Sequence, residues 1–283
     1  MKICYWGTAA AEGIPSIFCN CAVCREARAK KGRYIRTRSQ LFIDDCLLID
    51  FNADTNMHTL AYGYNMSQLK DVLITHIHED HYYPEDIGVR MEGYSHEMKY
   101  PTLTFHGSED MQATYEYKMH GNLKAVKDKR IAFDVLEKYK SYDISGFEVI
   151  SLPATHGTPD PRVYIIKKDG KTAFILNDCG IMIEENFEWL KKSGIKFDLV
   201  SYDCTMGNLD TVKAWGENAS HMGIPNILQV RKRLEENGNY LSTTKSVITH
   251  FSHNGDNVGY GDMLKIAEEN GFILAYDGMT LEF

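Results

Sequence analysis

Short apolar runs alternate with turn-forming polar residues along the whole chain. Runs rich in β-branched and aromatic residues, each closed by turn residues or followed by a helical pattern, predict strands. The predicted strands are Leu41–Ile43, Leu47–Asp50, Val72–Thr75, Leu103–His106, Phe147–Leu152, Val163–Lys167, Ala173–Asn177, Leu199–Asp203 and Val247–Phe251. Helical patterns, several of which open with Pro or an acidic residue, predict helices between them. The predicted helices are Met66–Lys70, Pro84–Tyr94, Glu184–Ser193, Ile224–Glu236 and Tyr260–Asn270.

Turn dipeptides join three pairs of these segments, at Asp44-Asp45, Asp169-Gly170 and Asp277-Gly278. The last two are strong hairpin signals, because Gly accepts a positive φ without steric cost. The sheets are therefore expected to be antiparallel or mixed. Clustered strands with helices interspersed favour an α/β fold of layered sheets covered by helices. No linker-like stretch divides the sequence, so we expect a single domain over residues 1–283.

The composition is that of a globular protein with a large core, since 43% of the residues are hydrophobic and 25% are charged. No run of about 18 apolar residues appears, which argues against a membrane span. The odd number of cysteines, with three crowded between Cys19 and Cys24, argues against a disulfide framework and favours the cytoplasm. A net charge of −8 disfavours a broad nucleic-acid surface. The basic segment from Lys30 to Arg38 is either a solvated loop or a patch for a small anion.

The sharpest chemical signal is the sequence T-H-I-H-E-D-H from Thr75 to His81, placed between a predicted strand and a predicted helix. In an extended or turning backbone His76 and His78 project to one side, and the bend brings Asp80 and His81 to a second nearby point. This arrangement can hold two metal ions side by side. A polar loop of hydrogen-bonded histidines is a poor alternative for three His and one Asp at this spacing.

Three more candidate ligands lie at or just beyond strand ends, where a rigid scaffold can aim a side chain. His156 follows the strand Phe147–Leu152, Asp178 ends the strand that begins at Ala173, and His250 closes the strand that begins at Val247. Taken singly, each would more often be a loop or core residue with its hydrogen bonds satisfied. Because all three follow the first motif in this order, they are stronger candidates together than separately.

A second constellation is the C-x-C-x-x-C spacing of Cys19, Cys21 and Cys24. Three thiolates suit tetrahedral Zn²⁺ and need one more ligand, which His253 can supply. Free buried or redox-active cysteines are the alternative for this cluster.

The order H-x-H-x-D-H, a separate His, an Asp before a Gly-containing turn and a late T-H resembles the ligand series of the metallo-β-lactamase superfamily. The resemblance spans essentially the whole chain and implies a four-layer αβ/βα sandwich with the metals at one edge of two sheets. It also implies the ligand assignment. One metal would be held by His76, His78 and His156, the other by Asp80, His81 and His250, with Asp178 bridging them.

The opening Gly7–Pro15, the cysteine cluster and the sequence T-H-F-S-H at Thr249–His253 resemble the PhnP-type phosphodiesterases, which cleave phosphoribosyl 1,2-cyclic phosphate. This resemblance implies a structural zinc at Cys19, Cys21, Cys24 and His253. It also implies that a His after the bridging Asp faces the substrate, and His221 is the natural match. The sequence departs from the family pattern near the expected site, at Ala9-Ala10-Ala11, Asp50-Phe51-Asn52 and Tyr82-Tyr83-Pro84.

We therefore expect a dinuclear site containing Zn or Mn that activates hydroxide for attack on a small, cyclic phosphodiester. His221 would protonate the departing alkoxide, because His titrates near pH 6.5; an ordered structural role is its alternative, and Asp80 is a second candidate acid. The expected partner is the anionic substrate, and a homodimer is left open. Alternatives are a tRNA 3′-processing nuclease, a hydrolase of quinone-cofactor biosynthesis and an inactive metal-binding scaffold.

Overall fold

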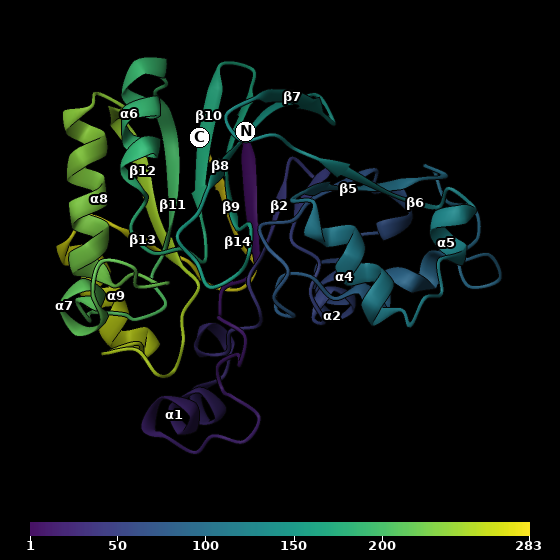
Figure 1. The fold of residues 1–283 in the computed structure, drawn as a ribbon. Coiled ribbons are helices and arrows are strands. Elements are labelled where there is room, and N and C mark those ends of the chain that lie inside the picture. The colour runs from purple at the N-terminus through teal and green to yellow at the C-terminus, as the bar shows by residue number, and fades with distance from the viewer.

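A computed structural model describes residues 1–283 and shows two seven-stranded sheets packed face to face, with helices on both outer faces (Figure 1). The predicted four-layer αβ/βα sandwich is confirmed. The N- and C-termini lie close together near the junction of the two sheets, and the segment that carries α1 projects beyond one end of the sandwich (Figure 1).

The first sheet is mixed: β14, β1, β2 and β3 pair antiparallel, and β3 to β6 pair parallel. Its strands in spatial order are β14 (Met279–Glu282), β1 (Lys2–Gly7), β2 (Gln40–Ile43), β3 (Leu47–Ile49), β4 (Asp71–Leu73), β5 (Leu103–Gly107) and β6 (Ile131–Val135). The second sheet is parallel from β13 to β10 and antiparallel from β10 to β7. Its strands are β13 (Ile273–Leu274), β12 (Tyr240–Thr249), β11 (Phe197–Asp203), β10 (Lys171–Leu176), β9 (Arg162–Lys168), β8 (Phe147–Pro153) and β7 (Ser141–Ile144).

Helices cover the outer face of each sheet (Figure 1). The helices of the chain are α1 (Ala22–Lys30), α2 (Thr55–Tyr62), α3 (Pro84–Ile87), α4 (Asp110–Lys118), α5 (Lys124–Lys127), α6 (Glu184–Ser193), α7 (Thr211–Trp215), α8 (Ile224–Glu236) and α9 (Tyr260–Glu269), of which α1 lies on the projecting segment. Short 3₁₀ turns lie at Gly32–Tyr34, Met66–Gln68 and Gly88–Arg90. None of the helices is both long and apolar enough to cross a membrane.

Three apolar cores correspond to the three interfaces between the layers. One lies between the sheets and contains Tyr5 and Tyr164. The largest packs the second sheet against α6, α8 and α9, with Phe187 and Val230 on its helix side. The third packs the first sheet against α4 through Tyr115. The two sheets are thus held rigidly, and the loops at their shared edge are fixed in place.

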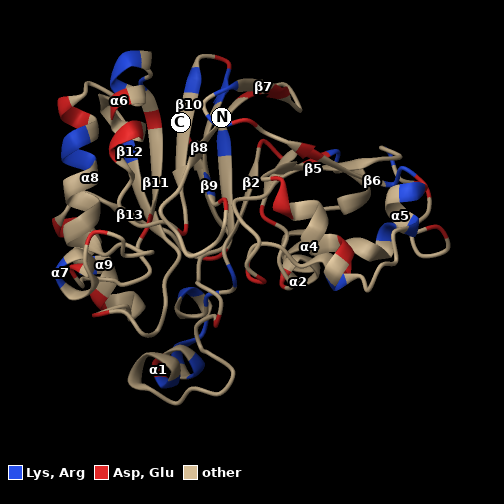
Figure 2. Ribbon diagram, viewed as in Figure 1, with Lys and Arg blue, Asp and Glu red and all other residues tan.

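The local signals that predicted α6 and α8 are present in the structure, and both helices have the predicted bounds. Helix α6 has acidic residues in its first turn, basic residues in its last and a left-handed Gly194 at its end, as its dipole and C-cap favour (Figure 2). In α8 the charged residues are confined to the C-terminal half, where Arg231–Arg233 precede Glu235 and Glu236 (Figure 2). The predicted hairpins at Asp44-Asp45 and Asp169-Gly170 join β2 to β3 and β9 to β10 and are confirmed.

The hairpin predicted at Asp277-Gly278 is wrong, because this turn carries the chain from β13 in one sheet to β14 in the other. Asp277 accepts hydrogen bonds from Thr8 and Thr37, which fix the turn against the loops of the first sheet. The buried Arg36 beside it donates to Thr8 Oγ1. The basic segment is therefore not a uniformly solvated loop.

Two predicted helices are shorter in the structure. The segment Met66–Lys70 forms only a 3₁₀ turn, because β4 begins at Asp71 and leaves no room for a second turn. The helix predicted over Pro84–Tyr94 ends at Ile87 and continues as 3₁₀. A Cβ at Gly88 would meet only the flexible end of the Met119 side chain, which packs against this glycine at the end of the helix.

Candidate metal centres

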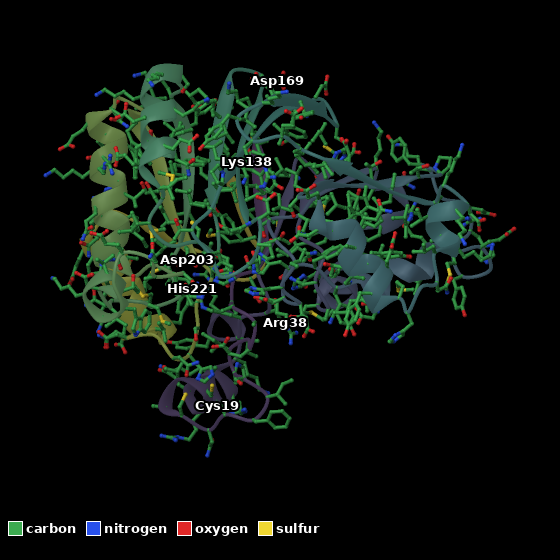
Figure 3. All side chains as sticks on the ribbon, in the orientation of Figure 1. Cys19, Arg38, Lys138, Asp169, Asp203 and His221 are labelled. Atoms are coloured by element: carbon green, nitrogen blue, oxygen red, sulfur yellow. The ribbon has the colours of Figure 1, made fainter.

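The candidate ligands meet at one edge of the sandwich because of strand direction. The neighbouring strands β10, β11 and β12 run parallel, so their carboxyl ends lie side by side. Asp178 follows β10, Asp203 ends β11 and His250 follows β12. The motif from His76 to His81 follows β4 of the first sheet, and His156 follows β8 of the second. Figure 3 shows Asp203 and His221 at this edge, with Cys19 on the projecting segment.

Three residues at this edge have left-handed backbone conformations although none is glycine. The φ angles are 66° at Asp50, 51° at Asp178 and 63° at His250. Such conformations are strained for ordinary residues and tend to cluster at functional sites. Each one ends a strand or follows it closely. The left-handed conformation therefore occurs at the turn that directs each side chain into the candidate site.

The first group of ligand atoms belongs to His76, His78, His156 and Asp178, all within 4.8 Å of one another. His78 Nδ1 lies 3.0 Å from His76 Nε2 and 3.0 Å from His156 Nε2. His76 Nε2 lies 3.3 Å from Asp178 Oδ2. These are the residues expected to hold one metal, together with the expected bridge.

The second group belongs to Asp80, His81, His250 and again Asp178. His81 Nε2 lies 3.2 Å from Asp80 Oδ2 and 3.1 Å from Asp178 Oδ2. His250 Nε2 lies 3.2 Å from His81 Nε2. Asp178 is the member common to both groups, as a bridging ligand would be.

The spacing of these atoms fits two metal ions. Nitrogen ligands about 2.0–2.1 Å from one tetrahedral zinc lie about 3.3 Å apart, close to the separations within each group. Asp178 Oδ1 is buried and has no hydrogen-bond partner, although His221 Nδ1 lies 3.0 Å away without the alignment of a hydrogen bond. A buried carboxylate oxygen without a partner is costly unless a cation or proton compensates it.

The outer nitrogens of His81 and His250 are engaged by the protein, which leaves their inner nitrogens for ligation. His81 Nδ1 lies 2.6 Å from the carboxylate of Asp50, which also accepts bonds from the Thr75 amide and hydroxyl. His250 Nδ1 lies 2.8 Å from Thr205 Oγ1. Partners of this kind fix the ring orientation and the tautomer of metal-ligating histidines.

Electrostatics at the two groups also fit cations. Burial lowers the pKa of His76 to about 3, so its ring is neutral and able to ligate at pH 7. Burial opposes the charged form of His81, but the carboxylates of Asp80 and Asp50 raise its pKa well above the usual value. The carboxylates around His81 thus favour a positive charge at this point, and a divalent cation supplies one as well as a proton does.

His221 lies on the wall of the cavity that holds both groups, a space of about 320 Å³. Its Nδ1 faces Asp178 and lies 3.4 Å from Asp203 Oδ2. Burial lowers the pKa of His221, but these two carboxylates outweigh it and raise the pKa to about 10. Its Nε2 is then the nitrogen left to reach a ligand in the cavity.

Asp203 is a site residue that the sequence pattern did not single out. It is fully buried, and its Oδ1 accepts from the amides of Thr205 and Met222. Its Oδ2 accepts from the Thr205 hydroxyl and faces His221 and His250. One sequence signal could have identified Asp203. It ends a predicted strand, and this strand lies along the chain between the strands that lead to Asp178 and to His250.

The predicted fourth ligand, His253, lies beside the three cysteines of the cluster. The ligand atoms of Cys19, Cys21, Cys24 and His253 lie within 4.8 Å of one another. His253 Nδ1 is 3.5 Å from Cys19 Sγ and 3.7 Å from Cys21 Sγ, near the roughly 3.6 Å expected between sulfur and nitrogen on one zinc.

Backbone amides stabilise negative charge on the sulfurs of this cluster, although burial and the neighbouring thiols raise the pKa of Cys24 to about 11. Cys19, Cys21 and Cys24 each accept a hydrogen bond from a backbone amide, of Cys21, Cys24 and Ser16 respectively. Partial burial opposes ionisation of Cys21, but the Cys24 amide and the neighbouring thiols lower its pKa to about 6. The cluster therefore fits a tetrahedral Zn²⁺ site that ties the projecting segment to the chain after β12.

We predict that Cys21→Ala lowers the melting temperature by roughly 5 °C or more, because a structural zinc contributes folding energy directly. The zinc content should fall by one ion per chain in the same variant. Cys46→Ala is the matched control, since this cysteine lies in the β2–β3 turn and belongs to no ligand group. An unchanged melting temperature in Cys21→Ala would rule out a structural zinc there.

Comparison with protein families identifies the superfamily to which the chain belongs. A profile described as the beta-lactamase superfamily domain matches residues 47–251, which include every member of both His/Asp ligand groups. No curated protein matches the sequence.

Solved structures resemble the whole chain. A diphosphatase from the PhnP family is 19% identical with a TM-score of 0.73, over 100% of this chain and 97% of that one. Zn²⁺-bound PqqB from Methylobacterium extorquens is 18% identical with a TM-score of 0.77, over 100% of both chains. The short form of human tRNase Z is 17% identical with a TM-score of 0.65, over 100% and 99%. At these identities the likeness shows the fold.

Proposed function

The chain belongs to the metallo-β-lactamase superfamily, and from that premise we propose that it is a phosphodiesterase with two divalent cations, Zn or Mn, in its active site. His76, His78 and His156 would hold one cation, Asp80, His81 and His250 the other, and Asp178 both. Such a pair of cations lowers the pKa of water and neutralises charge on phosphoryl oxygens. The observation that carries the proposal is the convergence of two ligand groups on one carboxylate beside His221.

The charge of the cavity supports an anionic substrate held together with cations. Its wall contains the carboxylates of Glu12, Asp80 and Asp178. These would repel a phosphate unless positive charge compensated them. His221, whose pKa is raised, adds one such charge on the wall. A diester carries a single negative charge, which this balance accommodates more readily than a dianion.

In the proposed reaction the residues of the chain orient the groups and move a proton. Asp203 is held by Thr205 and Met222 and in turn orients the His221 ring. His221 holds a proton at Nε2 and gives it to the departing alkoxide. Asp80 is less suited to donate a proton, because its neighbour His81 outweighs the effect of burial and holds the pKa of Asp80 below the usual range. A carboxylate of that kind is a ligand rather than a proton donor.

A screen of the purified protein against phosphodiesters, phosphomonoesters, thioesters and lactones tests this proposal. We expect aryl and alkyl phosphodiesters to have kcat/KM values at least about tenfold above the other classes, since the proposed site accommodates a single phosphoryl charge. Hydrolysis of lactones or thioesters with phosphodiesters unchanged would contradict the assignment. Release of nucleotides from tRNA 3′ ends in preference to small diesters would favour the processing-nuclease alternative.

A further inference from the structure

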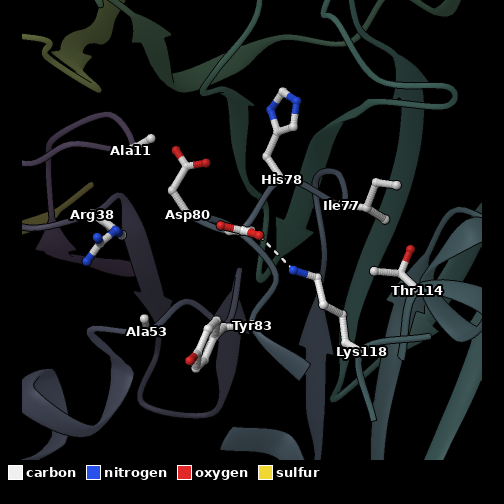
Figure 4. A pocket seen from close by; sticks show the side chains of 10 residues that line it. Ala11, Arg38, Ala53, Ile77, His78, Asp80, Tyr83, Thr114 and Lys118 are labelled. Atoms are coloured by element: carbon white, nitrogen blue, oxygen red, sulfur yellow. Dashed lines mark hydrogen bonds and ion pairs between the residues drawn. The ribbon is translucent and has the colours of Figure 1, made fainter. Parts of the chain in front are cut away.

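The basic segment of the chain contains two arginines with different surroundings. Arg38 borders a cavity together with His78 and Asp80 (Figure 4). Its charge is paired with the carboxylate of Asp54, whose Oδ1 lies 2.9 Å from Arg38 Nη1. Arg36 is only 2% exposed, and its Nη2 has no hydrogen-bond partner. A buried cation is costly unless other contacts compensate for it, so the remaining contacts of Arg36 show what it holds in place.

The Arg36 guanidinium contacts both Thr8 and Phe251. Its Nη1 donates to Thr8 Oγ1 at 2.8 Å and to the carbonyl of Ala275 at 2.7 Å. The Thr8 hydroxyl donates in turn to Asp277 Oδ1 at 2.6 Å. Burial lowers the pKa of Arg36 to about 10, so it remains charged at pH 7, and its guanidinium carbon lies 4.3 Å from the centre of the Phe251 ring. The face of this ring therefore helps to stabilise the buried cation.

Phe251 is fully buried and directly follows His250, a candidate ligand of the second group. Two backbone hydrogen bonds tie Phe251 to the loop after β1. Its amide donates to the Thr8 carbonyl at 2.9 Å, and its carbonyl accepts from the Ala10 amide at 3.0 Å. Arg36 thus acts on Phe251 in two ways, directly at the ring and indirectly through Thr8. Both contacts fix the backbone immediately after His250.

His250 needs such support because its backbone is strained. Its φ of 63° is a left-handed conformation, which a residue other than glycine keeps only where its surroundings hold it. Thr205 holds the ring, since its Oγ1 lies 2.8 Å from His250 Nδ1. The contacts of Phe251 hold the backbone that carries the ring. A shift of this backbone would move His250 Nε2, which lies 3.2 Å from His81 Nε2 in the second ligand group.

We infer that Arg36 is a positioning residue for His250, which directs Nε2 of that ligand to the cation of the second group by fixing Phe251 and Thr8. The inference rests on the proposed function for the presence of two cations, and not for the bond that is cleaved. The three histidines of the first group follow β4 and β8 rather than β12. The expected effect of Arg36 is therefore confined to one of the two cations.

Calorimetric titration with Mn²⁺ tests this on protein that retains only the zinc of the cysteine cluster, since thiolates favour softer ions than Mn²⁺. The parent should bind two equivalents. Arg36→Gln should weaken one of the two binding steps by about tenfold or more, the usual loss when a group that orients a metal ligand is removed, and leave the other unchanged. The same step should be lost in His250→Ala. Arg36→Lys, which keeps a charge beside the ring, should lose less affinity.

Arg90→Gln is the matched control, because Arg90 is also buried, donates to the backbone carbonyls of Tyr100 and Arg130, and lies outside the ligand groups. It should lower the melting temperature as Arg36→Gln does, but leave both Mn²⁺ binding steps unchanged. Phe251→Leu, which removes the aromatic face and keeps the position apolar, should weaken the same step as Arg36→Gln. This variant carries the test if Arg36→Gln does not fold.

Two unchanged binding steps in Arg36→Gln and Phe251→Leu would overturn the inference. Equal weakening of both steps would overturn it too, since a general loss of stability acts on the two groups alike. Because Mn²⁺ binding needs no turnover, these outcomes are separate from those of the proposed function. A parent protein that binds two equivalents of Mn²⁺ but cleaves no phosphodiester would contradict the proposed function and leave the role of Arg36 open to the same titration.

Discussion

Replacing Asp178 by asparagine or alanine is expected to reduce phosphodiester hydrolysis on the order of 10³-fold, because groups that only orient metal ligands already contribute about 10- to 100-fold. Asp178 is the carboxylate common to both ligand groups. It is buried, which opposes its charge, yet His250, His221 and its other neighbours hold its pKa well below the usual range. Its loss removes a negative charge that both groups share.

The asparagine variant separates chemistry from backbone strain. Asp178 has a φ of 51°, which asparagine tolerates better than alanine. Both variants should therefore lose activity, while Asp178→Asn keeps the melting temperature closer to that of the parent. Asp128→Ala, an exposed carboxylate paired with Lys124, is the control and should retain turnover. Near-normal turnover of Asp178→Asn with excess metal would show that no shared ligand is needed there.

Replacing His221 by alanine should cost roughly 10²-fold or more on an alkyl or ribose diester, the usual scale of acid catalysis, and distinctly less on an aryl diester. A nitrophenolate departs without a proton, whereas an alkoxide needs one in order to depart. His221 lies on the cavity wall and faces Asp178 and Asp203 through Nδ1. The ratio of the two losses therefore reports proton donation rather than binding.

Equal losses on the two diesters, which leave the leaving-group dependence of the parent unchanged, would instead assign His221 a phosphate-binding or structural role. The acid would then be reassigned to Asp80, which lines the same cavity. His96→Ala serves as the control, because this exposed histidine lies outside the ligand groups. It should leave both rates unchanged.

The sequence alone was sufficient for the residues whose position depends on local pattern. The ligands of the first motif are close in the chain, and those at His156, Asp178 and His250 follow strands that apolar runs predict. The bounds of α8 were predictable because an apolar stripe, an early proline and a charged end coincide. In these places local propensity and tertiary packing favour the same structure.

Features that depend on which strands are neighbours could not be predicted in this way. Asp203 gains its place only because β11 lies between β10 and β12. Asp50 is 31 residues from His81, which it orients. The turn at Asp277 has the sequence of a hairpin, but contacts with Thr8 and Thr37 from the start of the chain place it between two sheets. Such long-range contacts override local turn preference.

The metal content of the protein tests the central claim most directly. Elemental analysis of protein prepared without chelator should find three metal ions per chain, one of them the zinc of the cysteine cluster. When the two ions of the His/Asp groups are removed and restored by titration, phosphodiesterase activity should rise until two equivalents per chain are bound. Full activity at one equivalent, or in protein free of metal at the His/Asp groups, would contradict the dinuclear site.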